Sequence, residues 1–213
     1  MFPYKINLDS VEHEVQSIYC IGRNYLEHVK ELNNEVPKTP LVFVKPKGAI
    51  LLGDRLQIPD STKDLHHECE LVISIKRAGE NISADKASDY IEGITVGIDF
   101  TARDIQSVEK KNGHPWTLSK CQKGFAVLGK WENYSTKDYG FSLEVNGLKK
   151  QIGNSKDMHW NFSQIVSYLS GIVPLYPGDI IFTGTPAGVG RVVSGDAISA
   201  YVDEAKKLSL MIV

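Results

Sequence analysis

The sequence predicts an α+β fold: strand-rich, packed mixed β-sheets with a few short helices. Short runs rich in β-branched and other apolar residues outnumber the amphipathic helical segments. The helices do not alternate with single strands, as repeated βαβ units require. The chain has 213 residues and is 42% hydrophobic, enough to form one substantial core. We therefore expect a single domain over residues 1–213.

The stretch of residues 65–77, LHHECELVISIKR, predicts a strand that is at least half buried. Side chains two positions apart share a face of a strand, so Glu68 and Glu70 point one way and Cys69 points the other. Neighbouring carboxylates repel each other, and burial strengthens the repulsion. A hard divalent cation with oxygen ligands would offset it. A solvent-exposed face that carries two glutamates is the alternative, since charged residues are mostly exposed.

The helical pattern of residues 24–32 places apolar side chains towards the core at Leu26, Val29 and Leu32. On another stripe, His28 and Glu31 lie three residues apart and are therefore neighbours. An ordinary surface pair is the alternative to a functional one. The loop that follows contains two prolines and could hinge this helix as a lid.

Further strands and helices follow from periodicity and turn signals. We expect short strands at residues 16–22, 41–46, 49–53, 94–100, 126–131, 180–184, 196–202 and 208–213, and a hairpin at residues 141–151. The Asn-Gly pair in that hairpin suits a type I′ turn. We expect helices at residues 84–93, 102–113 and 162–171.

Polar side chains follow the strand expected at residues 94–100. Asp99 stands near its C-terminal end, just before a helix, where a structural cap is the alternative to a functional role. Arg103 and Gln106 are three apart on that helix and can look in one direction. The helix is broken by His-Pro-Trp, after which Lys120 stands in a loop or at a strand start.

Residues 173–190, VPLYPGDIIFTGTPAGVG, end in a tight glycine-rich loop. The loop is not a phosphate-binding P-loop, because no GK[ST] follows the glycines, and it does not match GxGxxG at the start of a helix. Its glycines would let backbone amides approach a small ligand, with the hydroxyl of Thr183 or Thr185 alongside. A turn that joins two strands is the alternative.

Composition narrows the class of protein. The net charge is −2 with no basic block, which does not favour a nucleic-acid partner. Cys20, Cys69 and Cys121 show no CxxC spacing and cannot all pair, so reduced thiols fit best. No signal pattern opens the chain, and no apolar run reaches membrane length. We therefore expect a cytoplasmic protein with no membrane partner.

Five motifs occur in order: CIGRNYLEH, HHECELVISI, VGIDFTARDIQ, PWTLSK and PGDIIFTGTPAGVG. Together they resemble the fumarylacetoacetate hydrolase family in its short single-domain form, and the acylpyruvate hydrolase branch in particular. The resemblance spans residues 18–196 and implies packed mixed sheets, a homodimer, and Mg²⁺ or Mn²⁺ as cofactor. Two segments depart from it or lack a role. Residues 121–131 lack the Cys-Pro that family members often carry, and residues 151–162 have no assigned role.

The resemblance implies three groups of site residues. The metal ligands would be Glu68, Glu70 and Asp99. The catalytic residues would be His28, Glu31 and Lys120. The substrate-binding residues would be Arg103, Gln106 and Thr185.

This set of residues predicts a metal-dependent hydrolase that acts on a small keto acid. It would cleave the C–C bond of an acylpyruvate, a β-diketo acid, to give pyruvate and a carboxylic acid, with His28 activating water. The same site would support decarboxylation or tautomerisation of oxaloacetate, or isomerisation of a 2-hydroxy-dienoate. An alternative of another class is a metal-binding β-domain without catalysis.

Overall fold

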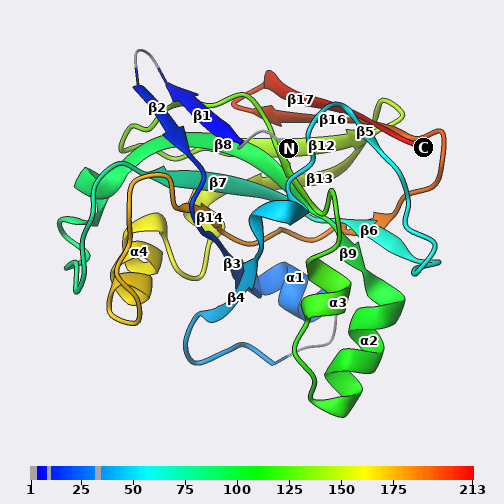
Figure 1. The fold of residues 1–213 in the computed structure, drawn as a ribbon, viewed down its shortest axis with the longest axis horizontal. Helices are drawn as coiled ribbons and strands as arrows, with labels where there is room; N and C mark the ends of the chain where they lie inside the picture. Colours follow the sequence, from blue (N-terminus) through cyan, green and yellow to red (C-terminus); the bar gives the residue numbers. More distant parts are fainter. Residues whose placement is uncertain (1–3, 9–10, 32–34) are drawn as a thin grey trace.

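The computed structural model describes residues 4–8, 11–31 and 35–213, and within these residues the fold is strand-rich and mixed, as the sequence predicts (Figure 1). The largest sheet has seven strands, in the order β10-β8-β7-β14-β3-β4, with β11 also paired to β8. These strands are β10 (Ala126–Leu128), β8 (Ile91–Asp99), β7 (Cys69–Ile75), β14 (Ile180–Phe182), β3 (Ile18–Gly22), β4 (Leu41–Lys45) and β11 (Glu132–Asn133). Strands β14 and β3 are parallel, whereas the other neighbours are antiparallel.

A five-stranded sheet packs against this one, in the order β13-β12-β16-β17-β5. Its strands are β13 (Leu148–Asn154), β12 (Gly140–Val145), β16 (Ala197–Val202), β17 (Ala205–Ile212) and β5 (Arg55–Leu56). Asn146 and Gly147 between β12 and β13 both have positive φ, as the expected type I′ turn requires. Two small sheets complete the set: β1 (Lys5–Leu8) with β2 (Val11–Glu14), and β15 (Gly190–Arg191) with β6 (Leu65–His67) and β9 (Thr101–Ala102).

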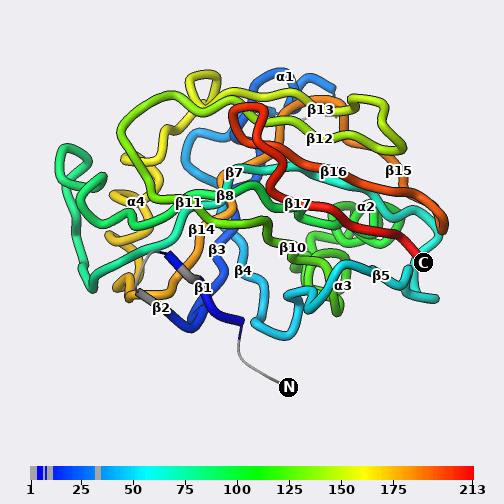
Figure 2. Tube along the Cα trace, turned by 90° about the horizontal axis from the view of Figure 1, so that it is seen from above, coloured from blue at the N-terminus to red at the C-terminus, as the bar shows by residue number. Residues whose placement is uncertain are grey.

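The seven-stranded sheet separates two hydrophobic clusters. Leu71 and Ile73 of β7 belong to the larger cluster, with apolar side chains of the five-stranded sheet, whereas Val72 belongs to the smaller cluster, with Ile6 of β1. Figure 2 shows β1 and β2 on one side of β7, β14 and β3, and β12 and β16 on the other. Because both faces of this sheet are covered, every residue of β7 is buried.

Two helices lie side by side in both views, α2 (Arg103–Asn112) and α3 (Thr117–Lys120), whereas α1 (Leu26–Glu31) lies apart from them in Figure 2. The helix α4 (Phe162–Ser170) lies across the molecule from α2 and α3 in both views (Figures 1 and 2). Its predicted apolar stripe is buried, and a capping box formed by Asn161 and Gln164 starts it. No helix in the described part of the chain is long and apolar enough to cross a membrane.

The strand expected at residues 65–77 is interrupted at Glu68. Residues 65–67 form β6, which pairs with β9 and β15, and residues 69–75 form β7, which pairs with β8 and β14. Cys69 and Glu70 still point to opposite faces, as expected, but the backbone changes sheets just before them.

Other expectations fail where long-range pairing overrides local pattern. Residues 84–93 do not form a helix: the segment holds only a 3₁₀ turn at Ala87–Tyr90, because Ile91 already pairs with Ile75 as the start of β8. The strand expected at residues 49–53 does not form, and a second 3₁₀ turn occupies residues 47–49. A third 3₁₀ turn spans Ser155–Asp157. Lys120 ends the helix α3 rather than standing in a loop.

The helix expected at residues 24–32 is only partly as predicted. Val29 is buried, but Leu26 is 41% exposed, because the buried face of α1 runs through His28 and Val29. Leu32 lies outside the described residues.

Candidate active site and metal centre

Three buried carboxylates meet where β7 and β8 lie side by side. Glu70 is the second residue of β7, Asp99 is the last residue of β8, and Glu68 occupies the break before β7. A potential ligand oxygen of each lies within 4.8 Å of the others, and none of the three residues is more than 6% exposed. The Asp99 backbone N–H donates to the Glu68 carbonyl at 2.8 Å, which fixes the approach of the two segments.

Two glycines allow this close packing. Gly97 pairs with Glu70 across β7 and β8, and a Cβ there would lie 2.7 Å from the Phe182 ring. Gly184 donates its N–H to Glu70 Oε2 at 2.7 Å. Its φ of +101° lies in the left-handed region, and a Cβ there would lie 2.7 Å from the Asn24 Cβ. The sequence predicts that this glycine-rich loop brings a backbone amide to a small ligand. In the structure the amide of Gly184 instead binds the carboxylate of Glu70.

Among the described residues, three cationic side chains contact two of the three carboxylates, Glu68 and Asp99. Lys120 Nζ lies 2.7 Å from Glu68 Oε2 and 2.6 Å from Asp99 Oδ2. Arg103 pairs with the other oxygen of Glu68. Lys45 Nζ lies 2.6 Å from Asp99 Oδ1. Lys45 Nζ also donates to the backbone carbonyls of Lys120, Phe125 and Phe100.

The charges at this site act in opposite directions on the two glutamates. Burial raises the pKa of Glu70 well above its usual value, and the charges of Asp99 and Glu68 raise it further. Burial alone would also raise the pKa of Glu68, but Lys120 and Arg103 hold it well below its usual range. Burial alone would lower the pKa of Lys120, yet Asp99 and Glu68 hold it above its usual value.

These residues fit a hard divalent cation. Glu70 faces two other carboxylates, and its repulsion from them is what a cation between the three would relieve. Carboxylate oxygens are the ligands that Mg²⁺ and Mn²⁺ prefer. Glu68, Glu70 and Asp99 would hold the ion, and Lys120 contacts two of these ligands, Glu68 and Asp99.

The predicted lid residues are connected to each other and to the glycine-rich loop. His28 Nδ1 lies 3.1 Å from Glu31 Oε2, and Glu31 Oε1 accepts the N–H of Gly188 at 3.0 Å. His28 is buried, whereas Glu31 is exposed. The interaction with Glu31 occupies one ring nitrogen of His28 and holds α1 against the loop.

Eight of the nine predicted site residues line one cavity of about 40 Å³, room for an ion or a water molecule. They are His28, Glu68, Glu70, Asp99, Arg103, Gln106, Lys120 and Thr185. The ninth, Glu31, reaches it through His28. Arg103 Nη1 donates to Gln106 Oε1 at 2.6 Å, as their spacing on α2 predicts. Of the two candidate threonines, Thr185 lines the cavity, while Thr183 donates to the carbonyl of Leu71.

Two organising residues escape the sequence analysis. Gln151 of β13 is buried; its Oε1 accepts the Cys69 N–H at 2.9 Å, and its Nε2 donates to Thr185 Oγ1 at 2.8 Å. Nothing in residues 151–162 signals this role. The sequence does contain a signal for Lys45. A single lysine ends the apolar run LVFV, and a lysine in such a place is either exposed to solvent or buried in an ion pair.

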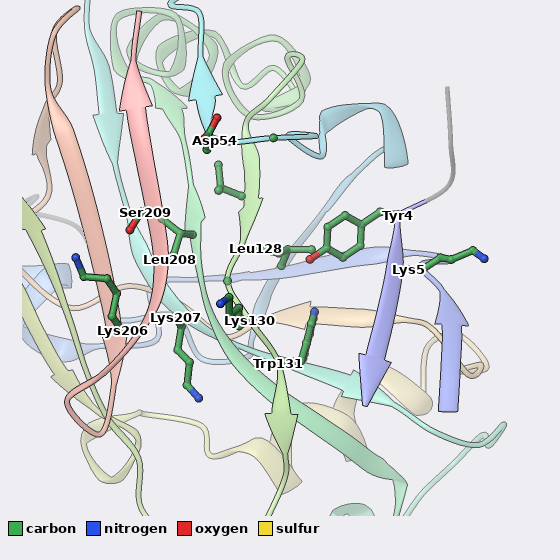
Figure 3. Close-up of a pocket in the computed structure, with 13 residues that line it drawn as sticks. Tyr4, Lys5, Asp54, Leu128, Lys130, Trp131, Lys206, Lys207, Leu208 and Ser209 are labelled. Carbon is green, nitrogen blue, oxygen red and sulfur yellow. The ribbon is translucent and has the colours of Figure 1, made fainter. Parts of the chain in front are cut away.

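A wider groove of about 700 Å³ lies elsewhere, beside β10, β17 and β1 (Figure 3). Three of its lysines are engaged locally: Lys207 pairs with Glu132, Lys5 pairs with Glu12 at 2.6 Å, and Lys206 lies 5.7 Å from the Tyr201 ring. Figure 3 shows its labelled side chains spread along the three strands rather than converging on one point. We therefore assign the chemistry to the smaller, buried cavity.

The mixed-sheet fold and its buried carboxylate triad define a divalent-metal-dependent enzyme. The chain belongs to the fumarylacetoacetate hydrolase family: residues 17–212 match the family described as fumarylacetoacetate (FAA) hydrolase C-terminal.

Individual relatives agree with this family assignment. The chain superposes on the crystal structure of fumarylpyruvate hydrolase from Pseudomonas aeruginosa in complex with Mn²⁺ and pyruvate, with a TM-score of 0.93, 32% identity, and coverage of 99% of this chain and 96% of that one. It is 42% identical over 190 residues to the mitochondrial oxaloacetate tautomerase of Arabidopsis thaliana, covering 87% of this chain and 85% of the relative. It is 40% identical over 195 residues to the mitochondrial oxaloacetate decarboxylase of Dictyostelium discoideum, covering 88% of each.

Proposed function

We propose that the protein is a Mg²⁺- or Mn²⁺-dependent hydrolase that cleaves an acylpyruvate to pyruvate and a carboxylic acid. The observation that carries the proposal is the His28–Glu31 pair beside the carboxylate triad: a histidine on the cavity wall, with Nδ1 held 3.1 Å from a carboxylate. A fumarylpyruvate hydrolase that superposes over nearly the whole chain and binds Mn²⁺ and pyruvate supports it.

The cation, when bound, supplies Lewis-acid stabilisation to the enolate oxygen that develops on the keto acid. Arg103 and Gln106 lie on one face of α2 and would donate to the substrate carboxylate. Thr185 would contact the substrate beside them from the glycine-rich loop. Lys120, which lines the cavity beside Glu68 and Asp99, would be a cationic donor to the substrate oxygens.

His28 would act as the general base. With Nδ1 held by Glu31, its Nε2 takes a proton from water, and the hydroxide attacks the distal carbonyl. The C–C bond then breaks, the acyl group leaves as a carboxylic acid, and the imidazolium returns the proton to the pyruvate enolate. Hydrolysis needs residues that position and activate a water molecule, and His28 with Glu31 can do so. Their presence therefore favours hydrolysis over a reaction that consumes no water.

A second candidate is tautomerisation or decarboxylation of oxaloacetate. Identities of 42% and 40% to an oxaloacetate tautomerase and an oxaloacetate decarboxylase favour it. Enolate stabilisation at the same cavity would serve either reaction, and neither requires an attacking water.

The homodimer that the family resemblance implies is part of the proposal and is tested by light scattering of the purified chain.

The test is turnover of acetylpyruvate, fumarylpyruvate and oxaloacetate with Mg²⁺, for the parent, for His28→Ala, and for a Glu68→Ala/Glu70→Ala control. We expect the parent to release pyruvate and a carboxylic acid from the acylpyruvates. We expect the control to lose all turnover, and His28→Ala to lose hydrolysis while still binding metal. Turnover of oxaloacetate alone would replace the hydrolase with the second candidate.

A further inference from the structure

Glu109 of α2 is a buried carboxylate to which neither the sequence motifs nor the proposed mechanism gives a role. It is only 5% exposed, and it lies three residues after Gln106, so the two are neighbours on the helix surface. Gln106 faces the active-site cavity, whereas the carboxylate of Glu109 is directed at α3. Because a buried carboxylate is costly unless it is hydrogen-bonded, its partners indicate what it does.

Glu109 accepts two hydrogen bonds from α3. Its Oε1 accepts the backbone N–H of Leu118 at 3.0 Å, and its Oε2 accepts the hydroxyl of Ser119. The backbone carbonyl of Glu109 accepts the N–H of His114 at 2.8 Å, so the same residue also fixes the turn between the two helices. Ser119 is buried as well, and the low polarity around these bonds strengthens them.

The helix α3 needs such support because it has only four residues. A helix of one turn is unstable by itself, and the N–H groups of its first turn have no acceptor within it. Trp116, which precedes the helix, has a side chain that can donate but not accept a hydrogen bond. Glu109 therefore supplies the cap that the sequence next to α3 does not.

The last residue of α3 is Lys120, which contacts the ligand carboxylates. Its Nζ lies 2.7 Å from Glu68 Oε2 and 2.6 Å from Asp99 Oδ2. A lysine side chain has four rotatable bonds, so its ammonium group stays at one point only where the backbone below it is fixed. Lys45 donates to the backbone carbonyl of Lys120. Glu109 thus holds the beginning of this helix, and Lys45 holds its end.

We propose that Glu109 is a positioning residue, which caps α3 and thereby places the ammonium group of Lys120 at Glu68 and Asp99. Glu109 acts through the helix and Lys120 rather than on the reacting atoms. The inference rests on the proposed function only for its effect on turnover, since the contacts themselves do not depend on the reaction.

The test measures whether Lys120 stays protected when the cap is removed. Acetic anhydride acetylates accessible lysines, and mass spectrometry of the peptides gives the rate at each position. Lys120 is 2% exposed and should react slowly in the parent. In Glu109→Leu the helix loses two hydrogen bonds to a charged acceptor, so the rate at Lys120 should rise at least about tenfold. Acylpyruvate hydrolysis should fall about 10²-fold, as expected for a misplaced catalytic group.

Glu109→Gln is the matched control, because it keeps the size of the side chain and can still make both contacts. The amide oxygen can accept the Leu118 N–H, and the amide nitrogen can donate to Ser119 Oγ. The Ser119 hydroxyl can then donate to the Trp116 carbonyl, which already lies 3.2 Å away. The acetylation rate of Lys120 and the turnover should both remain within about threefold of the parent.

A second variant and a thiol probe separate local loosening from global unfolding. Cys69 is buried on β7, and its thiol should stay unreactive in every variant. If Glu109→Leu exposes Cys69 too, Ser119→Ala decides, because it removes one hydroxyl and one of the two contacts. We expect it to raise the acetylation rate of Lys120 several-fold, and an unchanged rate in Ser119→Ala would then overturn the proposal.

The two proposals fail separately. If the protein hydrolyses acylpyruvates and a folded Glu109→Leu variant either protects Lys120 like the parent or keeps the parent turnover, the positioning role is wrong and the hydrolase stands. If Glu109→Leu exposes Lys120 in a protein that hydrolyses no acylpyruvate, the hydrolase is wrong and the placement of Lys120 by Glu109 stands.

Discussion

The side chains of Gln151 and Thr185 are joined by a 2.8 Å hydrogen bond from Nε2 to Oγ1, and this bond links the five-stranded sheet to the active-site loop. Thr185 Oγ1 in turn donates to the Cys69 carbonyl at 2.8 Å, while Gln151 Oε1 accepts the Cys69 N–H. Both backbone polar groups of Cys69, the residue between Glu68 and Glu70, are thus fixed by two residues distant in sequence.

Replacing Gln151 should therefore weaken the metal centre as well as the fold. Gln151→Leu leaves the buried Cys69 N–H and Pro186 carbonyl without this partner. We expect a loss of about 2–3 kcal/mol in the free energy of unfolding, measured by urea denaturation, and weaker Mn²⁺ binding. Gln16→Leu, at an exposed glutamine, should change neither by a measurable amount. Unchanged Mn²⁺ affinity in Gln151→Leu would show that Gln151 does not position the ligands.

Neutralising the two glutamates of the triad should have opposite effects without metal. Glu70 is repelled by Asp99 and Glu68, so Glu70→Gln should raise the melting temperature in EDTA. Glu68 pairs with Lys120 and Arg103, so Glu68→Gln should lower it. Mg²⁺ should raise the melting temperature of the parent and of neither variant. Equal shifts of the two variants in EDTA would contradict this account of the charges.

Gly184 should resist substitution for two reasons. Gly184→Ala places a methyl group 2.7 Å from the Asn24 Cβ and also requires an alanine at a φ of +101°. We expect it to lower the free energy of unfolding by about 2 kcal/mol or more, and to weaken metal binding through the amide that holds Glu70. Gly195→Ala is the control, because its φ is +96° but no atom lies within 4 Å. It should show only the backbone cost of about 1 kcal/mol. Equal losses in the two variants would exclude the steric contact with Asn24.

Removing Glu31 should separate hydrolysis from the other chemistry of the site. Glu31→Ala frees the Nδ1 of His28 and the N–H of Gly188, so the base loses its orientation and α1 its contact with the loop. We expect acylpyruvate hydrolysis to fall about 10²-fold, with metal affinity and any oxaloacetate decarboxylation retained. Glu27→Ala, an exposed residue of the same helix, should leave all three unchanged. A parallel loss of hydrolysis and decarboxylation would assign Glu31 to substrate binding.

Local pattern was sufficient for the strands β7 and β8, which carry Glu70 and Asp99 of the triad. Alternation predicted that Glu70 and Cys69 point to opposite faces, and the apolar stripe of α4 predicted its buried side chains. Pattern could not place the break at Glu68, because the partner strands of β6 and β7 come from distant segments. Nor could it predict a 3₁₀ turn at residues 87–90, since pairing of Ile91 with Ile75 decides it.

The side chains that organise the site were harder to predict than its ligands. Gln151 contacts Cys69 across 82 positions of sequence, and Lys45 contacts Phe125 across 80. Such contacts follow from how the sheets pack, and a single sequence holds no local trace of that packing. The ligand triad was accessible because its spacing and order resemble those of a known family.

The cations Lys45, Lys120 and Arg103 give two carboxylates of the triad, Asp99 and Glu68, counter-ions of their own. In zinc fingers, by contrast, the chain stays unfolded until the metal binds. We therefore expect this chain to fold before an ion binds, with the charge of Glu70 left for the ion to neutralise. Scarcity of the metal would then silence this protein without sending it to proteolysis.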